Sequence, residues 1–175
     1  MNDLNRSGRV FWITGLSGSG KSTMCSNLTE YLRKSGRTVI RLDGDKLRQV
    51  LDSTRGHSRE DRRDLAMRYA RLCRLLAGQG VDVTIATISL FKEVHNWNRE
   101  NLPNYHEIYL DVPLDELKRR DPKNIYKRAM ANELSNVAGV DLEVDFPEKP
   151  DVVIRHENGK GSDDSFQELV EKLKL

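Results

Sequence analysis

The segment 15–22, Gly-Leu-Ser-Gly-Ser-Gly-Lys-Ser, constrains the fold of this chain most, because it matches the phosphate-binding pattern G-x-x-x-x-G-K-[S/T]. Such a loop turns its backbone N–H groups inward around a phosphate chain, and its glycines permit the dihedral angles of that turn. Lys21 brings a positive charge to the β- and γ-phosphates, and the hydroxyl of Ser22 is expected to ligate Mg²⁺. The loop works only between a strand and a helix whose N-terminus faces the phosphates, so the pattern predicts an α/β fold.

The residues on either side of this phosphate loop fit that requirement. The apolar run at 10–14 predicts a strand, and 22–35 predicts a helix that is apolar on one side and ends at Gly36. We therefore expect ATP and Mg²⁺ as cofactors, with Lys21 also catalytic through the charge that it neutralises. The residues expected to hold the phosphates are Gly15, Ser17, Gly18, Ser19, Gly20, Lys21, Ser22 and Thr23.

Segments typical of strands and helices alternate along the rest of the chain. Further strands are expected at 38–42, 81–88, 107–112 and 152–155, and further helices at 58–77, 114–120 and 165–174. Ser58 with Asp61 and Ser165 with Glu168 have the spacing of helix-capping pairs. Strands separated by helices predict a mostly parallel central sheet covered on both faces, the three-layer sandwich of P-loop NTPases and kinases.

The chain is expected to form one P-loop kinase domain at 9–175 after a flexible N-terminus at 1–8, because it contains no repeat and no linker. The segment 121–150 fits the alternation least, since it is polar, basic at its start and interrupted by Pro147 and Pro150; its part at about 121–145 is called the lid segment below. In a nucleotide kinase, a segment of this kind is expected to be a mobile lid that closes over the substrates.

Composition limits the partners of the chain. Lys plus Arg number 29 and Asp plus Glu 27, so a net charge of +2 gives no overall field to attract nucleic-acid polymers or membranes. The two cysteines, Cys25 and Cys73, are too few for a disulfide framework or a zinc site. Without an apolar stretch typical of a signal peptide or a membrane span, we expect a cytoplasmic protein that acts on a small molecule.

Two aspartates flank a glycine at the end of the second expected strand, in the order Asp43-Gly44-Asp45 with Arg48 after them. Ligands of open α/β sheets bind at that edge. The aspartates could hold Mg²⁺ or its water and accept a proton from an attacking hydroxyl, or they could form an ordinary turn that caps a helix. Because the pair follows the phosphate loop by one crossover, we favour the first interpretation, with Ser22 and Asp43 at the metal.

Three arginines, Arg59, Arg62 and Arg63, crowd the start of the long helix expected after Ser58. The helix dipole disfavours cations at that end, and neighbouring acidic residues offset only part of this cost. A bound anion would offset more of it. The alternative is a charge-rich helix start that is simply solvated.

These motifs, in this order and spacing, resemble those of the adenylylsulfate (APS) kinases, which phosphorylate the ribose 3′-hydroxyl of adenosine 5′-phosphosulfate. The resemblance runs from about residue 10 to residue 154 and implies a P-loop kinase that uses ATP and Mg²⁺ and forms a homodimer. Its product would be 3′-phosphoadenosine 5′-phosphosulfate, for sulfate assimilation. The matching motifs lie at 15–23, 42–48, 58–62, 86–89, 109–114, 120–129 and 139–141.

The resemblance also implies roles for single residues. Asp45 would accept the proton of the 3′-hydroxyl, and Asp43 would support the metal or its water. Ser89 matches a serine to which some descriptions of the family give a catalytic phosphoenzyme role, although in-line transfer needs only positioning and charge stabilisation. The residues expected at the acceptor are Asp45, Arg48, His57, Arg62, Leu65, Ile88, Ser89, Lys123, Asn136 and Val137. Those expected near ATP are Arg120, Lys127 and Arg128, the last two being alternatively a solvated helix face.

The departures from the family pattern cluster at positions that handle the base. His57 and Val137 stand where the family usually has stacking phenylalanines, Leu65 where it has an asparagine, and Leu90 where it has a proline. One interpretation is drift on a tolerant surface. The other is a substrate whose base is not adenine, such as cytidine diphosphoramidate, which related enzymes phosphorylate in capsule and surface-polysaccharide modification.

Two other classes of P-loop protein are less favoured by the sequence. A regulatory switch protein would need a guanine-binding motif such as Asn-Lys-x-Asp, and the chain contains none. A kinase of small metabolites on the same fold, of the gluconate or shikimate type, would explain the phosphate loop but none of the later motifs. The acceptor nucleotide itself is not fixed by the sequence.

Overall fold

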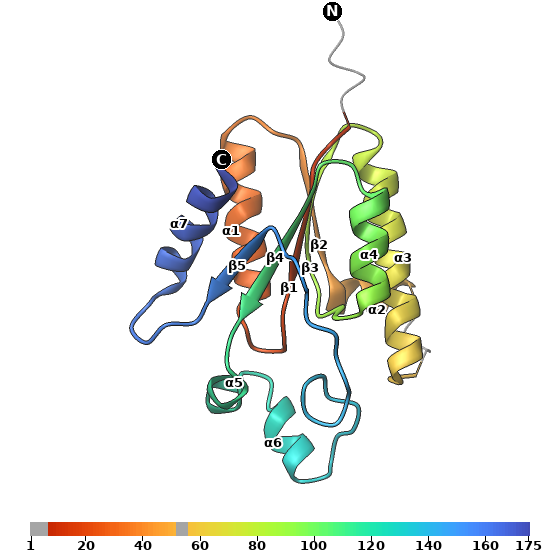
Figure 1. Cartoon of the computed structure of the whole chain (residues 1–175), viewed down its shortest axis with the longest axis vertical. Coiled ribbons are helices and arrows are strands. Elements are labelled where there is room, and N and C mark those ends of the chain that lie inside the picture. Colours follow the sequence, from red (N-terminus) through yellow and green to blue (C-terminus); the bar gives the residue numbers. More distant parts are fainter. Residues whose placement is uncertain (1–6, 52–55) are drawn as a thin grey trace, which may run out of the picture.

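The computed structural model describes residues 7–51 and 56–175, so residues 1–6 of the N-terminus expected to be flexible lie outside the described residues. Its centre is a five-stranded parallel sheet in the order β2-β3-β1-β4-β5 (Figure 1). The strands are β1 (Val10–Thr14), β2 (Val39–Asp43), β3 (Asp82–Ala86), β4 (Tyr105–Asp111) and β5 (Val152–Arg155). The helices within these ranges are α1 (Lys21–Lys34), α2 (Gly44–Leu51), α3 (Arg59–Ala77), α4 (Lys92–Asn101), α5 (Leu114–Arg120), α6 (Ile125–Met130) and α7 (Ser162–Leu173).

Helices cover both faces of the sheet, which confirms the three-layer sandwich expected from the sequence. Figure 1 shows α1 and α7 on one side of the strands and α3 and α4 on the other. All residues of the central strand β1 are buried, as is typical of a parallel strand between two helical layers. Phe11 and Ile13 pack in the cluster under α1 and α7, whereas Val10 and Trp12 pack under α3 and α4.

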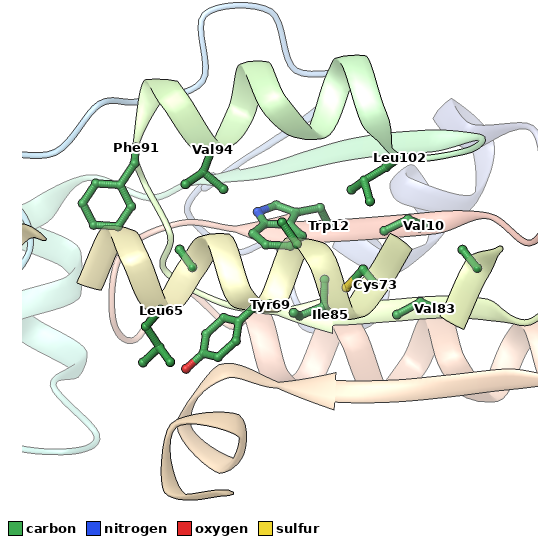
Figure 2. Close-up of a cluster of buried hydrophobic side chains, with 13 residues drawn as sticks. Val10, Trp12, Leu65, Tyr69, Cys73, Val83, Ile85, Phe91, Val94 and Leu102 are labelled. Carbon is green, nitrogen blue, oxygen red and sulfur yellow. The ribbon is translucent and has the colours of Figure 1, made fainter. Parts of the chain in front are cut away.

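The core under α3 and α4 reaches the end of the sheet where the phosphate loop begins. Trp12 lies in the middle of this cluster, with Val10 and Val83 at one end and Leu65 and Phe91 at the other (Figure 2). Each of these side chains is at most 4% exposed. Residues that stabilise the fold at that end therefore also form part of the wall of the space beyond it.

The expected strands are all present, with ends shifted by a few residues, and Ser58 caps α3 as predicted by accepting the N–H of Asp61 at 3.1 Å. The cap expected at Ser165 is wrong, because α7 begins at Ser162. The N–H of Gly161 donates to Asp164 at 3.0 Å there, and the acidic first turn suits the helix dipole. Glu168 instead pairs with lysines on both sides of it.

The sequence did not predict three helices, α2, α4 and α6. In α4, the buried face consists of Val94, His95 and Asn98, so it carries almost no apolar periodicity. α2 has no buried residue, and α6 is a short helix with Tyr126 as its buried residue. These helices form because neighbouring segments hold them, which an amphipathic pattern does not reveal.

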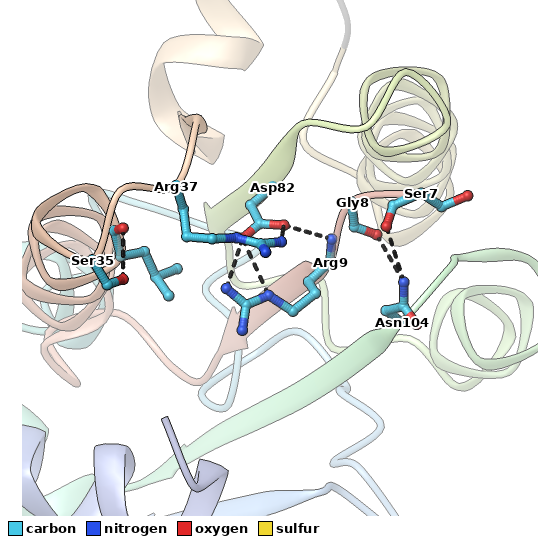
Figure 3. A network of polar contacts seen from close by, with 8 residues as sticks. Ser7, Gly8, Arg9, Ser35, Arg37, Asp82 and Asn104 are labelled. Carbon is cyan, nitrogen blue, oxygen red and sulfur yellow. Dashed lines mark hydrogen bonds and ion pairs between the residues drawn. The ribbon is translucent and has the colours of Figure 1, made fainter. Parts of the chain in front are cut away.

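A buried carboxylate holds the opposite end of the sheet together. Asp82 at the start of β3 is 1% exposed and accepts hydrogen bonds from Arg9 and Arg37 at 2.8–3.1 Å (Figure 3). Burial opposes its charge, but the bonds from both arginines outweigh this and lower the pKa of Asp82. The cluster ties β1, β3 and the turn before β2 together, far from the phosphate loop.

The cysteines are buried and unpaired, as expected. Burial raises the pKa of the Cys25 thiol to about 11, so it is not a reactive thiolate. Among the helices of the described ranges, none combines the length and the apolar character that a membrane crossing requires.

Candidate active site

The candidate site lies where the carboxyl ends of the strands meet, the edge at which open α/β sheets bind ligands. A pocket of about 660 Å³ opens there between the phosphate loop, the start of α3 and the lid segment. It is lined by the predicted site residues Ser17, Gly18, Gly20, Lys21, Ser22, Thr23, Asp43, Asp45, Arg48, His57, Arg62, Leu65, Ile88, Ser89, Lys123 and Val137. One pocket thus brings together residues that the sequence linked to phosphate binding, to chemistry and to the acceptor.

The phosphate loop follows β1 and leads into α1, as its pattern requires. Gly15 and Ser19 are buried within the loop rather than in the pocket lining. A Cβ at Gly15 would lie 2.8 Å from the carbonyl oxygen of Leu110, so only glycine allows this close approach to β4. The backbone of the loop therefore rests directly on the sheet.

The backbone of the phosphate loop holds the side chain of Lys21 in place. Its ammonium group donates to the carbonyl oxygen of Leu16 at 2.6 Å. Burial lowers the pKa of Lys21 to about 8, although the nearby charges of Asp45 and Asp43 favour the charged form. An anion beside this group would restore its full positive charge.

Asp43 caps a helix, as one of its two interpretations predicted, and it also contacts the phosphate loop. One carboxylate oxygen accepts the N–H of Asp45 at 3.0 Å and so caps the start of α2. The other oxygen accepts the hydroxyl of Ser22 at 3.1 Å. The turn and the contact with the phosphate loop are thus two functions of the same side chain.

Asp45 points across the pocket to the lid segment, where its carboxylate meets the ammonium group of Lys123 at 2.5 Å. Both side chains are largely exposed, at 74% and 58%. An exposed pair of this kind is worth only ~0–1 kcal/mol, so a substrate group can displace it at little cost. The carboxylate is therefore accessible to a ligand in the pocket.

Ser89 is less accessible than its neighbours. It is 6% exposed, its hydroxyl bonds that of Thr87 at 2.6 Å, and its backbone has a φ of 27°. The carbonyl of Ile88 accepts a hydrogen bond from Thr14, and that of Ser89 lies 3.0 Å from Nε2 of His95. These contacts fix the segment after β3 as a wall of the pocket rather than presenting a free nucleophile.

The arginines at the start of α3 have separate partners. Arg62 donates to the carbonyl oxygens of His57 and Asn136, each at 3.0 Å, and faces the pocket. Arg59 pairs with Asp145 at 2.6 Å, and Arg63 is matched by neighbouring carboxylates on its own helix. Of the three, Arg62 alone lines the pocket, so a shared anion is not needed to explain the crowding.

Part of the pocket lining is apolar. Leu65 and Val137 are buried there at 3% and 5% exposure, and His57 is exposed at its rim. Burial and the charges of two arginines lower the pKa of His57, which favours its neutral form. Tyr69 and Phe91 also line the pocket, and the sequence analysis did not predict this. Both are aromatic residues that the sequence does not distinguish from ordinary core residues.

Some predicted site residues lie outside this lining. Arg120 bonds Glu116 at 2.7 Å and approaches Nδ1 of His156 at 3.0 Å. Lys127 and Arg128 are exposed on α6, and Asn136 contributes its carbonyl to Arg62. Their contact with ATP or acceptor stays a prediction.

The lid segment packs more than its composition suggested. Tyr126, Val137 and Ala138 are buried in a cluster with Leu16 and Leu90. The carboxylate of Asp141 accepts the N–H groups of residues 136 and 137, which fixes the turn between them. This segment therefore has a small core of its own beside the phosphate loop.

Comparisons with known proteins agree with this arrangement. The family model described as adenylylsulphate kinase matches residues 7–155. A cytidine diphosphoramidate kinase of Campylobacter jejuni is 39% identical over 166 residues, which cover 95% of this chain and 96% of that protein. An adenylyl-sulfate kinase of Clostridium acetobutylicum is 42% identical over 153 residues, covering 86% of this chain and 76% of that protein.

The solved structures include the Mycobacterium tuberculosis APS kinase in complex with AMPPNP and APS. It is similar to this chain with a TM-score of 0.88 and 32% identity, covering 97% of this chain and 99% of that one. Adenylylsulphate kinases thus match this chain both in sequence and in fold. The chain belongs to the adenylylsulphate kinase family, and it is a phosphotransferase that acts on a hydroxyl group.

Proposed function

We propose that this chain transfers the γ-phosphate of ATP to the ribose 3′-hydroxyl of a nucleoside 5′-phosphate derivative. The observation that carries the proposal is a single pocket shared by the phosphate loop, the aspartates at the end of β2, and Arg48 and Arg62. Phosphoryl transfer needs accurate positioning and stabilisation of charge, with little covalent help from the protein. These three groups of residues can supply both.

On the donor side, the phosphate loop would bind ATP through its backbone N–H groups. The N-terminus of α1 faces the same space and favours negative charge. Lys21 would contact the β- and γ-phosphates, which would replace the carbonyl of Leu16 as its partner and keep it charged.

Mg²⁺ fits the oxygen atoms of Ser22, at the start of α1, and of Asp43, at the end of β2, which lie 3.1 Å apart. Mg²⁺ usually takes only one or two protein ligands and completes its shell with water and phosphate oxygens. When bound, the ion would neutralise charge on the phosphates.

On the acceptor side, Asp45 would accept the proton of the attacking hydroxyl, and Lys123 would turn from Asp45 toward the acceptor's anionic groups. Arg48 and Arg62 support an anionic acceptor at this place, because both residues line the pocket and their guanidinium groups are fixed by main-chain carbonyls. They would grip the 5′-phosphate derivative and so orient the ribose.

Two acceptors fit this site. Adenosine 5′-phosphosulfate is supported by the family and would give 3′-phosphoadenosine 5′-phosphosulfate, for sulfate assimilation. Cytidine diphosphoramidate is supported by the wall that would hold the base, where His57, Leu65 and Val137 lie. An aromatic stack contributes ~1–3 kcal/mol per base, so a purine gains less from this wall than from paired phenylalanines. The residue types of this wall are the observation that supports the cytidine compound.

The decisive experiment measures kcat/KM for both acceptors with ATP and Mg²⁺. We expect cytidine diphosphoramidate to have the higher kcat/KM, because the loss of two stacking partners should weaken adenine binding by about ten- to a hundredfold. Low micromolar KM for adenosine 5′-phosphosulfate, with higher kcat/KM, would reverse the choice of acceptor. Phosphorylation of neither compound would refute the proposal.

Paired variants test the wall itself. His57→Phe, alone and with Leu65→Asn, should shift the ratio of kcat/KM toward the adenosine compound. His106→Phe is the matched control, because His106 stacks on Phe11 outside the pocket and its replacement should leave the ratio unchanged. An unchanged ratio in the His57 variants would show that this wall does not select the base.

A further inference from the structure

Three consecutive residues of the phosphate loop are supported from outside by the lid segment. A Cβ at Gly139 would lie 3.0 Å from Cδ1 of Leu16, and one at Gly18 would lie 3.5 Å from Cδ of Pro122. Between them, the carbonyl oxygen of Ser17 accepts the hydroxyl of Tyr126 at 2.8 Å. Figure 1 shows α6, which carries this tyrosine, beyond the loop that joins β1 to α1.

Tyr126 is firmly held in this position. It is 1% exposed and packs with Leu16, Leu117 and Val137. The carboxylate of Asp121 accepts the N–H groups of Tyr126 and its successor at 3.2 and 2.9 Å, which fixes the start of α6. Burial raises the pKa of Tyr126 to about 12, so the hydroxyl stays protonated and can donate at neutral pH.

The hydrogen bond sets the orientation of a peptide group. A peptide unit is planar, with its carbonyl oxygen and its N–H on opposite sides. The Ser17 carbonyl is turned toward Tyr126, so the N–H of Gly18 is directed the other way. Gly18 lines the pocket, has a φ of 79°, and its N–H has no hydrogen-bond partner among the described residues.

We propose that Tyr126 is a positioning residue for the nucleotide: its hydroxyl holds the Ser17–Gly18 peptide so that the Gly18 N–H faces the phosphates of ATP. The inference rests on the proposed nucleotide site and deepens it. Tyr126 acts through the loop and does not touch the ligand. It also links ATP binding to the segment that carries Lys123.

The test is the Tyr126→Phe variant, which keeps the buried ring and removes only the hydroxyl. Calorimetry with AMPPNP and Mg²⁺ should show a Kd raised roughly three- to tenfold, the value of one buried hydrogen bond. Tyr31→Phe is the matched control, because the Tyr31 hydroxyl donates to the main-chain oxygen of Leu175 at 3.2 Å, outside the pocket. Its Kd should equal that of the unaltered protein.

A second measurement separates positioning from simple loss of packing. Tyr126→Phe should raise the KM for ATP and leave the KM for the acceptor nearly unchanged, with melting close to that of Tyr31→Phe. Unchanged AMPPNP affinity would overturn the proposal. Equal losses for AMPPNP and acceptor would also overturn it, because the tyrosine would then only hold the segment folded. If the unaltered protein binds AMPPNP but phosphorylates neither acceptor, the proposed acceptor reaction fails and this test still stands.

Discussion

Lys21 changes its charge within the range in which enzymes are usually assayed. Burial lowers its pKa to about 8, so in the free protein it is charged below that pH and increasingly neutral above it. Phosphates favour the charged form, so ATP binding takes up a proton above pH 8. We expect the affinity for AMPPNP to fall as pH rises through about 8, measured by calorimetry, while an unaltered affinity up to pH 10 would contradict this.

The Lys21→Ala variant should lose most phosphoryl transfer, by a factor of ~10²–10³, because a charge at the developing transition state is removed. Its melting temperature should be unchanged or higher, since no buried ammonium group remains to be desolvated. Steady-state kinetics and a melting curve check both statements. The pH dependence of AMPPNP binding near pH 8 should also disappear. Near-normal turnover would refute the role of the loop lysine.

Asp45 offers a second test at the residue scale. Asp45→Asn keeps the shape of the side chain but cannot accept a proton, so kcat should fall by roughly 10²–10⁴. Affinity for AMPPNP should change little, because Asp45 faces Lys123 rather than the phosphate loop. Loss of nucleotide binding in this variant would instead make Asp45 part of the metal site.

At the scale of elements, the lid segment combines buried and exposed stretches. Tyr126 and Val137 are anchored in a small cluster, whereas residues 131–133 are exposed. We expect hydrogen exchange in 121–145 to be fast without ligand and slower with nucleotide and acceptor, most clearly near 131–136. Equal and strong protection in both states would mean that the segment is not a lid.

The carboxylate of Asp82 joins elements at the opposite end of the sheet. Its pKa is lowered, so its contribution to stability is complete above about pH 4 and is lost as pH falls through its folded value. Asp82→Asn should lower the free energy of unfolding by about 3 kcal/mol at pH 7. Glu60→Gln, which removes an exposed partner of Arg63, should change it by less than about 0.5 kcal/mol in the same urea titration. A loss in Asp82→Asn no larger than in this control would refute the role of the cluster.

At the scale of the whole molecule, the resemblance to the family predicts a homodimer. Light scattering coupled to size exclusion should give about twice the chain mass of 20.1 kDa at micromolar concentration. A mass equal to one chain, across a tenfold range of concentration, would contradict the homodimer.

The sequence by itself determined the features that depend on local pattern. The strands around the phosphate loop follow from apolar runs, the loop from its glycines and lysine, and the cap at Ser58 from its spacing to Asp61. The placement of Asp43 and Asp45 at the ligand-binding edge follows from their position at the carboxyl end of an expected strand. Each of these signals lies within a few residues, so no distant contact is needed to read it.

Only the tertiary structure decided which distant residues meet. It placed Lys123 against Asp45 and Tyr126 against Ser17. It also paired Arg59 with Asp145 rather than with a bound anion. Composition suggested a loose lid segment, yet Leu16 and Leu90 supply apolar partners for it from other parts of the chain. These contacts join residues that are far apart in the chain. A local sequence pattern cannot predict them, because it does not show which distant segments become neighbours.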